Sequence, residues 1–283
     1  MIRLESEGLV CAIEPQLGGC IAGLWLDGVP VLRSTTETPA SARQSGSYPL
    51  VPFSNRIERA TLRWQGTSHP LVNNNAPEPH AIHGVGWQRP WSVLDADDTF
   101  AMLAYEHPAD AAWPFAFDSS QVLRLRGNTL ELTLALTNQS NGPAPAGLGW
   151  HPFFVKRPGS RIAFAATGRW EMGPDKLPTV RSPSPGLDAE CASLDVDHCF
   201  DGWDGAATLR DAQLQATLRS SLRRLVAFTN ASRDVIAIEP VSHVNNAINL
   251  VAAGADGEAL GLRTLQPGET LTAEMSIAVE RVK

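Results

Sequence analysis

The sequence lacks features that mark whole classes of protein. No apolar run among its 283 residues approaches the ~20 that a membrane-spanning helix requires. Residues 1–7 carry acidic side chains where a secretory signal peptide needs a basic start and a long apolar stretch. No cluster of Lys and Arg is interleaved with aromatic residues, and the net charge is −7. We therefore expect a cytoplasmic protein that binds neither nucleic acid nor membrane.

Cysteine is also scarce. The chain has four cysteines, and none of them forms a Cys-x-x-Cys pair. Sparse cysteines of this kind are typical of reduced cytosolic thiols and small core residues rather than of a disulfide framework. Hydrophobic residues make up 43% of the chain and charged residues 19%, which is ordinary for a globular protein long enough to bury a substantial core.

Helical periodicity is nearly absent, and strand patterns take its place. Residues 130–136 and 270–279 alternate apolar and polar side chains with a period of two, which is typical of half-buried strands. Turn residues between apolar runs predict two hairpins, one joining 9–13 to 20–26 and one joining 61–64 to 69–72. Further short strands are expected at 214–218, 225–228 and 235–238. We expect helix only in short turns, such as 108–111.

The chain shows no internal repeat and no change of composition that would mark a domain boundary. Its 23 glycines and 21 prolines are spread as turns rather than collected in a linker. The sequence therefore predicts an all-β fold with very little helix. The simplest arrangement is one large antiparallel β-sandwich domain over residues 1–283.

One histidine, His151, stands in the unusual segment Gly-Leu-Gly-Trp-His-Pro-Phe-Phe at 147–154. Pro152 biases His151 toward an extended conformation and cannot donate to a sheet ladder, so the segment reads as a strand that ends or lies at an edge. A histidine walled by aromatic faces suits proton transfer on a ligand with apolar faces and hydroxyl edges, such as a sugar. The alternative is a core histidine that is hydrogen-bonded beside a turn.

Glu239 follows four apolar residues, 235–238, that indicate a strand buried between layers. Partial loss of water at the end of such a strand would raise the pKa of Glu239 toward the range that suits a general base. The alternative is a glutamate that ends a strand at the surface.

Three further stretches are too polar for core packing. Asn55 and Arg56 could present fixed donors to ligand hydroxyls, or could belong to a surface loop. Asp197 could accept two hydroxyl hydrogen bonds, and charge-assisted bonds are roughly twice as strong as neutral ones. His83 is a better ligand contact than His80, and the pair lacks the further ligands of a zinc site, so we predict no metal.

Taken in order, these segments resemble the signature of the aldose 1-epimerase (galactose mutarotase) family. The resemblance runs from about residue 8 to the C-terminus, and its most specific parts are the His-Pro-Phe-Phe segment and the Asn-Arg pair. The matching elements are Asn55-Arg56, His83-Gly84, His151-Pro152-Phe153-Phe154, Asp197-His198-x-Phe, Glu239-Pro240 and the turn Leu265-Gln266-Pro267-Gly268-Glu269. The family more often has tyrosine where Phe153 stands.

The resemblance implies a large β-sandwich that interconverts the anomers of an aldose. It assigns Glu239 as the general base and His151 as the general acid, with Asn55, Arg56, His83 and Asp197 binding the sugar. Ring opening needs no oxidant and no phosphate transfer, so no cofactor is expected. The acid must be protonated when sugar binds, and a nearby glutamate would favour that charge. We expect Glu239 and His151 in one pocket, on opposite sides of a space one pyranose ring wide.

Two other functions remain open. A hexose-6-phosphate mutarotase would grip a phosphate with arginines, but the basic residues near the motifs, Arg59, Arg63 and Arg89, form no evident cluster. A non-catalytic carbohydrate-binding module would need the aromatic residues and Arg56 but not both Glu239 and His151. The sequence does not specify the sugar or the oligomeric state.

Overall fold

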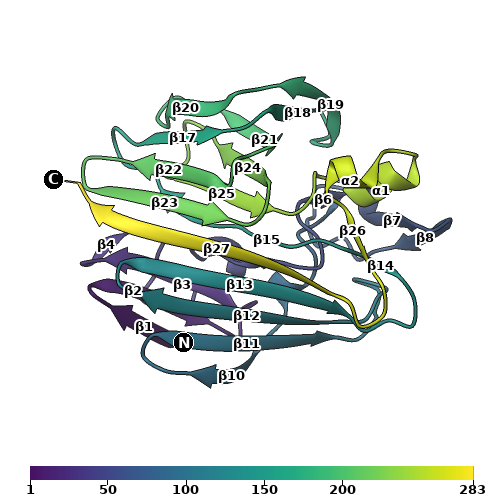
Figure 1. Cartoon of the computed structure of the whole chain (residues 1–283), viewed down its shortest axis with the longest axis horizontal. Coiled ribbons are helices and arrows are strands. Elements are labelled where there is room, and N and C mark those ends of the chain that lie inside the picture. The colour runs from purple at the N-terminus through teal and green to yellow at the C-terminus, as the bar shows by residue number, and fades with distance from the viewer. Residues whose placement is uncertain (283) are drawn as a thin grey trace.

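Two large antiparallel sheets dominate the structure, a computed structural model that describes residues 1–282 (Figure 1). The nine-stranded sheet consists, in spatial order, of β10 (Ser92–Ala96), β11 (Phe100–His107), β12 (Phe117–Arg126), β13 (Thr129–Asn138), β27 (Thr270–Arg281), β23 (Leu214–Ser220), β22 (Ala206–Arg210), β17 (Arg161–Ala165) and β20 (Gly186–Glu190). The eight-stranded sheet consists of β19 (Pro178–Pro183), β18 (Gly168–Met172), β21 (Val196–Asp201), β24 (Arg224–Thr229), β25 (Val235–Val241), β15 (Gly149–Trp150) and β5 (Pro49–Leu50), with β16 (Phe153–Val155) also paired to β25.

Smaller elements complete the fold. A four-stranded sheet holds β1 (Ile2–Ser6), β2 (Leu9–Glu14), β3 (Cys20–Leu26) and β4 (Val29–Pro30). Three two-stranded pairs join β6 (Arg56–Ile57) to β9 (Ala81–Ile82), β7 (Thr61–Trp64) to β8 (Thr67–Pro70), and β14 (Ala144–Ala146) to β26 (Arg263–Leu265). The helices are α1 (Ala247–Ala252), α2 (Gly257–Leu260) and the 3-10 turns Ala42–Gln44, Glu58–Ala60 and Gly86–Gln88.

The predicted all-β architecture is confirmed, and so are the main predicted strands. The opening hairpin pairs β2 with β3, and the second pairs β7 with β8. The second hairpin closes with Trp64 opposite Thr67, so β8 begins two residues before the predicted 69–72 and Val72 lies outside it.

The helix predicted at 108–111 is wrong, because this segment forms an irregular turn. The carboxylate of Asp110 accepts hydrogen bonds from the backbone N–H groups of Ala112 and Trp113, at 2.8 and 3.1 Å. Such local side-chain bonding competes with a helix. The two short α-helices instead lie beyond β25, where α1 packs beside β7 at one end of the molecule (Figure 1).

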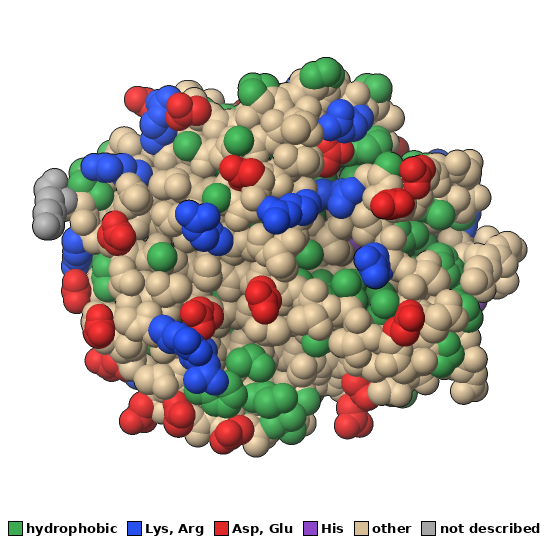
Figure 2. Space-filling view, in the orientation of Figure 1, with side chains coloured by type: hydrophobic (Ala, Val, Ile, Leu, Met, Phe, Trp, Pro, Cys, Tyr) green, Lys and Arg blue, Asp and Glu red, His purple; other side chains and the backbone are tan. Residues whose placement is uncertain are grey.

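The apolar residues of the alternating strands form the layer between the sheets. In β13, Leu130, Leu132, Leu134 and Leu136 are buried, while every residue between them is half-buried. One face of the nine-stranded sheet therefore packs on the core and the other faces water. On the face of the molecule drawn in Figure 2, acidic and basic side chains are interspersed. Within residues 1–282, the search for a helix with the length and apolar character needed to cross a membrane finds none.

Strand β25 is buried on both sides, because it lies between two apolar layers. Ile236 and Ile238 belong to the hydrophobic cluster between the large sheets. Val235, Ala237 and Val241 belong to a second cluster on the outward side of the eight-stranded sheet. Since side chains alternate along a strand, this register places residue 239 on the outward side as well.

Candidate active site

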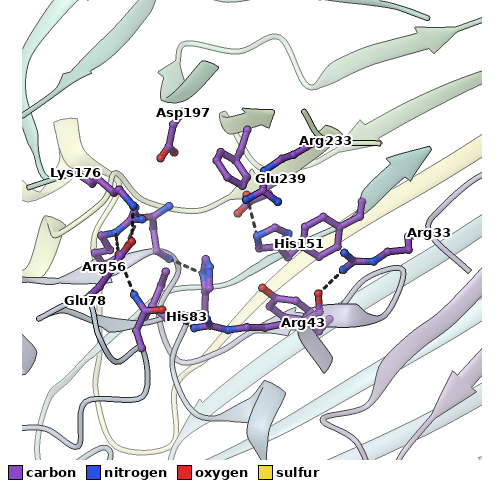
Figure 3. A pocket seen from close by; sticks show the side chains of 16 residues that line it. Arg33, Arg43, Arg56, Glu78, His83, His151, Lys176, Asp197, Arg233 and Glu239 are labelled. Atoms are coloured by element: carbon purple, nitrogen blue, oxygen red, sulfur yellow. Dashed lines mark hydrogen bonds and ion pairs between the residues drawn. The ribbon is translucent and has the colours of Figure 1, made fainter. Parts of the chain in front are cut away.

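A cavity of about 290 Å³ lies on the outward side of the eight-stranded sheet. Figure 3 shows the side chains that line it. All six residues that the sequence singled out are among them: Asn55, Arg56, His83, His151, Asp197 and Glu239. The structure therefore brings together residues that are far apart in the chain. The volume of the cavity is at the low end of the range usual for small-molecule sites.

Strand register explains why Asp197 and Glu239 meet. Phe228 of β24 pairs with Asp197 on one side and with Ala237 on the other, and Val226 pairs with Glu239. The side chains of residues that pair directly across neighbouring strands share one face of the sheet. Both carboxylates consequently project from the same face, on either side of β24.

Register also places His151 beside Glu239. Gly149 of β15 pairs with Val241, and Phe153 of β16 pairs with Ala237, so the residue midway between them lies next to Glu239. Nε2 of His151 is 3.2 Å from Oε1 of Glu239. The expectation that the two side chains share one pocket holds, but the expectation that a sugar ring separates them is wrong. They are neighbours on one wall.

Burial changes the proton affinity of both groups. Burial, and then the nearby carboxylate of Asp197, raises the pKa of Glu239 well above its ordinary value. Burial lowers the pKa of His151 to about 3, and Arg33, Arg43 and Arg233 also lower it. Both shifts favour the neutral forms of the two groups.

Each member of this pair also has an unused hydrogen-bonding atom. Nδ1 of His151 and Oε2 of Glu239 are buried and have no hydrogen-bond partner among residues 1–282. Buried polar atoms in folded proteins are almost always paired, and both of these atoms belong to side chains that line the cavity.

Asn55, Arg56 and His83 form an interlocked group at the other side of the cavity. Asn55 adopts a left-handed conformation with a φ of 54°, and its Oδ1 accepts hydrogen bonds from the backbone N and the Nη1 of Arg56. The backbone N–H of Asn55 donates to Nδ1 of His83 at 3.1 Å. Arg56 is further held by Glu78 at 3.3 Å.

The hydrogen bond from Asn55 fixes the tautomer of His83. Because Nδ1 accepts a hydrogen bond, the neutral ring carries its hydrogen on Nε2 and can donate it. Burial, together with His151 and Arg56, lowers the pKa of His83 well below its ordinary value. His80 serves the structure instead, since its Nδ1 accepts from the backbone N of Arg59 and it does not line the cavity.

Three of these side chains could hold a metal ion. One donor atom each from His83, His151 and Glu239 lies within 4.8 Å of the others. Two histidines and one carboxylate form a known ligand set for divalent metals. The guanidinium groups of Arg33, Arg43, Arg56 and Arg233 line the same cavity, and their positive charges oppose a bound cation.

Sequence reasoning missed most of the basic side chains of the site. Arg33, Arg43, Lys176 and Arg233 line the cavity together with Tyr48, whereas Arg59, Arg63 and Arg89 do not. Only Tyr48 had a signal, since it opens the Pro-bracketed stretch that ends in Asn55 and Arg56. The ring of Tyr48 packs against that of His151 with centroids 4.9 Å apart.

Comparisons with known proteins identify the family and the fold of the chain. The sequence model of the family described as aldose 1-epimerase matches residues 1–278. The Escherichia coli (strain K12) protein YphB is 31% identical over 93% of each chain. The crystal structure of an Escherichia coli K12 protein, provisionally called an aldose 1-epimerase, superposes with a TM-score of 0.88 at 29% identity, over 99% of this chain and 98% of that one. A galactose mutarotase-like protein from Clostridium acetobutylicum has a TM-score of 0.87 at 20% identity, over 99% and 95%, and so shares the fold.

Proposed function

Because the chain belongs to the aldose 1-epimerase family, we propose that it interconverts the α and β anomers of an aldose. Glu239 takes the proton from the C1 hydroxyl while His151 protonates the ring oxygen O5, and the C1–O5 bond breaks. The open aldehyde rotates about C1–C2 and recloses with both transfers reversed. The observation that carries this proposal is the contact between a buried carboxyl and a buried imidazole, 3.2 Å apart, in a sugar-sized cavity.

The protonation states also support this assignment. A neutral carboxylic acid beside a neutral imidazole holds as many protons as a carboxylate beside an imidazolium. One proton transfer across the 3.2 Å between Glu239 and His151 therefore produces the base and the acid that ring opening needs. A bound sugar favours this charged form, because its C1 hydroxyl donates to the carboxylate and its O5 accepts from the imidazolium.

The remaining polar groups suit the sugar hydroxyls. Asp197 offers a carboxylate, His83 offers an Nε2–H donor, and Arg56 offers a guanidinium already oriented by Asn55 and Glu78. We assign these groups to binding and orientation rather than to proton transfer at C1. A non-catalytic sugar-binding module would have no use for the buried pair of Glu239 and His151.

The test is anomer exchange, followed by polarimetry or NMR across neutral and phosphorylated aldoses and corrected for the spontaneous rate. Glu239→Gln keeps the shape of the side chain but removes the base, so kcat falls by roughly 10²–10⁴ with little change in KM. Arg56→Ala acts mainly on KM, because the arginine holds the sugar equally in the ground and transition states. Glu131→Gln, on the outward face of strand β13 in the nine-stranded sheet, is the matched control.

Two outcomes would contradict the proposal. Near-normal turnover by Glu239→Gln would move the base to another residue, with Asp197 next. Sugar binding by the wild-type protein without anomer exchange would favour the carbohydrate-binding module.

A further inference from the structure

The cavity carries a charge opposite to that of the protein as a whole. The chain has a net charge of −7. Five basic side chains line the cavity, namely Arg33, Arg43, Arg56, Lys176 and Arg233, against the three acidic side chains Glu78, Asp197 and Glu239. Burial favours the neutral form of Glu239, which makes the excess of positive charge larger.

The basic residues divide into two groups. Arg56 and Lys176 are both paired with the carboxylate of Glu78. Arg33, Arg43 and Arg233 have no carboxylate within 4.0 Å among the residues described, 1–282. In Figure 3 Arg33 and Arg233 lie beside His151, on the side away from Glu78, whereas the guanidinium of Arg43 lies below His83. Arg43 donates from Nη2 to Oδ1 of Asn75 at 2.8 Å. We call Arg33, Arg43 and Arg233 the unpaired arginines.

Aromatic rings hold the unpaired arginines in place. The guanidinium carbon of Arg33 lies 4.0 Å from the ring centroid of Phe153, that of Arg43 lies 5.0 Å from Trp87, and that of Arg233 lies 4.3 Å from Phe228. Arg33 also donates from Nε to the backbone oxygen of Ser45 at 2.9 Å and from Nη2 to the backbone oxygen of Arg43, and Nη1 makes no hydrogen bond to residues 1–282. Guanidinium groups fixed in this way lose little conformational entropy when they bind an anion.

The unpaired arginines lie on the side of the proposed acid. The Phe153 ring that Arg33 contacts also packs against His151, with ring centroids 4.3 Å apart. All three arginines are close enough to His151 to lower its pKa, whereas Arg56 is the guanidinium that acts on Glu239. His151 serves O5 in the proposed reaction. In an aldopyranose, O5 is bonded to C5, and C5 carries C6, so a substituent at C6 would extend toward this side.

The geometry points to an aldose with an anionic group at C6, a carboxylate or a phosphate, that is bound by Arg33, Arg43 and Arg233. This inference rests on the proposed anomer exchange and names its substrate class. Planar guanidinium groups match the geometry of both anions. Sequence reasoning ranked a phosphorylated substrate second because Arg59, Arg63 and Arg89 form no cluster, and the cavity is instead lined by other arginines.

The experiment compares glucose, glucose 6-phosphate and glucuronate, with anomer exchange measured for each. We expect kcat/KM to be at least tenfold higher for one of the anionic sugars than for glucose, and the better of the two identifies the anion. Arg233→Gln is the first variant, because this exposed side chain makes no hydrogen bond to residues 1–282. It lowers the ratio of kcat/KM for the anionic sugar to that for glucose by about tenfold or more.

The control is Arg126→Gln, which removes an equal charge on the surface of the nine-stranded sheet and leaves the ratio unchanged. Added KCl raises KM for the anionic sugar but not for glucose, because salt screens exposed charges. Arg43→Gln repeats the test at a second unpaired arginine that is also exposed. Arg33→Gln is avoided, because that guanidinium also fixes a backbone loop.

The outcomes separate this inference from the proposed function. Equal or faster exchange of glucose would overturn the anionic substrate and leave the anomer exchange standing. A preference for the anionic sugar that Arg233→Gln and Arg43→Gln do not reduce would overturn the role of the unpaired arginines. If no sugar is exchanged, the proposed function fails, and calorimetric binding of the same three sugars decides the inference. Binding of both anionic sugars no tighter than glucose would then reject it.

Discussion

The protonation states of Glu239 and His151 are linked, because their side chains lie 3.2 Å apart in the same wall of the cavity. In the proposed reaction, removing either one disables the same ring-opening step. We therefore expect His151→Asn to lower kcat by roughly 10²–10⁴, as Glu239→Gln does. The double variant should be little slower than either single variant, since groups that act as a unit are not additive. Losses that multiply in the double variant would assign the two residues to separate steps.

The donor atoms of His83, His151 and Glu239 lie within 4.8 Å of one another, yet the surrounding guanidinium groups oppose a cation. Proton transfer by Glu239 and His151 also needs both groups free. We expect full activity after exhaustive treatment with EDTA. Loss of activity that one added divalent ion restores would show that a metal takes part.

The chemical types of the site were predictable from the sequence, but their spacing was not. Asn55, Arg56 and His83 stand in polar, Gly-rich segments that core packing does not explain. The contact of His151 with Glu239 depends on the pairing of Gly149 and Phe153 with strand β25. The local sequence does not reveal which residues of β25 they pair with. Arg233 gave no signal, because a single arginine in a polar loop is ordinary at a surface.

At the scale of elements, the turn after β9 sets the position of His83. His83 and Gly84 both have positive φ, 62° and 70°. A Cβ on Gly84 would lie 2.1 Å from the backbone oxygen of Val51, whereas one on Gly66, with φ of 78°, would meet nothing within 4 Å. Gly66→Ala should therefore cost only the backbone strain, ~1–2 kcal/mol.

Gly84→Ala should cost at least ~2 kcal/mol more in unfolding free energy, because the steric overlap with Val51 adds to that strain. It should also lower activity through a displaced His83, while Gly66→Ala leaves activity unchanged. Urea unfolding and anomer exchange measure the two effects. Equal destabilisation by both substitutions would mean that the turn relaxes without cost.

His243 joins the end of β25 to the segment that carries Asn55. Its Nε2 accepts the backbone N–H of Ser54 at 3.1 Å, and its Nδ1 donates to the carbonyl of Val244 at 2.8 Å, so the ring is neutral. Burial lowers the pKa of His243 to about 4, against ~6.5 in an unfolded chain. Between these two pKa values His243 is protonated in the unfolded chain but not in the folded protein. The free energy of unfolding therefore falls as the pH falls.

His243→Gln removes this titration. We expect the wild-type protein to lose more unfolding free energy than the variant between pH 6.5 and pH 4, by up to ~1.4 kcal/mol per pH unit. Denaturant unfolding at several pH values provides the comparison. Parallel curves for the two proteins would mean that His243 keeps an ordinary pKa when folded.

Elements with a strong period of two were predictable, whereas those set by tertiary contacts were not. The alternation of residues 130–136 specified β13 because one face of that strand packs on the core. Helix α1 was missed because it has only six residues, too few to show a helical period, and its N-cap Asn246 makes no side-chain cap hydrogen bond. Its side chains bond neighbouring segments instead, and Asn249 donates to the backbone oxygen of Thr61 at 2.8 Å.

At the scale of the whole molecule, one hydrophobic cluster includes residues of the nine-, eight- and four-stranded sheets. It includes Leu134 of the nine-stranded sheet, Ile238 of the eight-stranded sheet and Leu24 of the four-stranded sheet. We propose that residues 1–283 form one domain that unfolds as a unit. The calorimetric enthalpy of unfolding should equal the van't Hoff enthalpy. Two separate heat-absorption peaks would instead divide the chain into independent units.

The alternation of β25 has a consequence for how such proteins diversify. A substitution at the outward position 239 alters the chemistry of the cavity, while those at Ile236 and Ile238 alter how firmly the sheets hold together. Specificity and folding can thus drift under separate selection within a single strand. The fold persists at 20% identity, with a TM-score of 0.87. A scaffold of this kind leaves evolution free to change the lining of the cavity without rebuilding the interior of the protein.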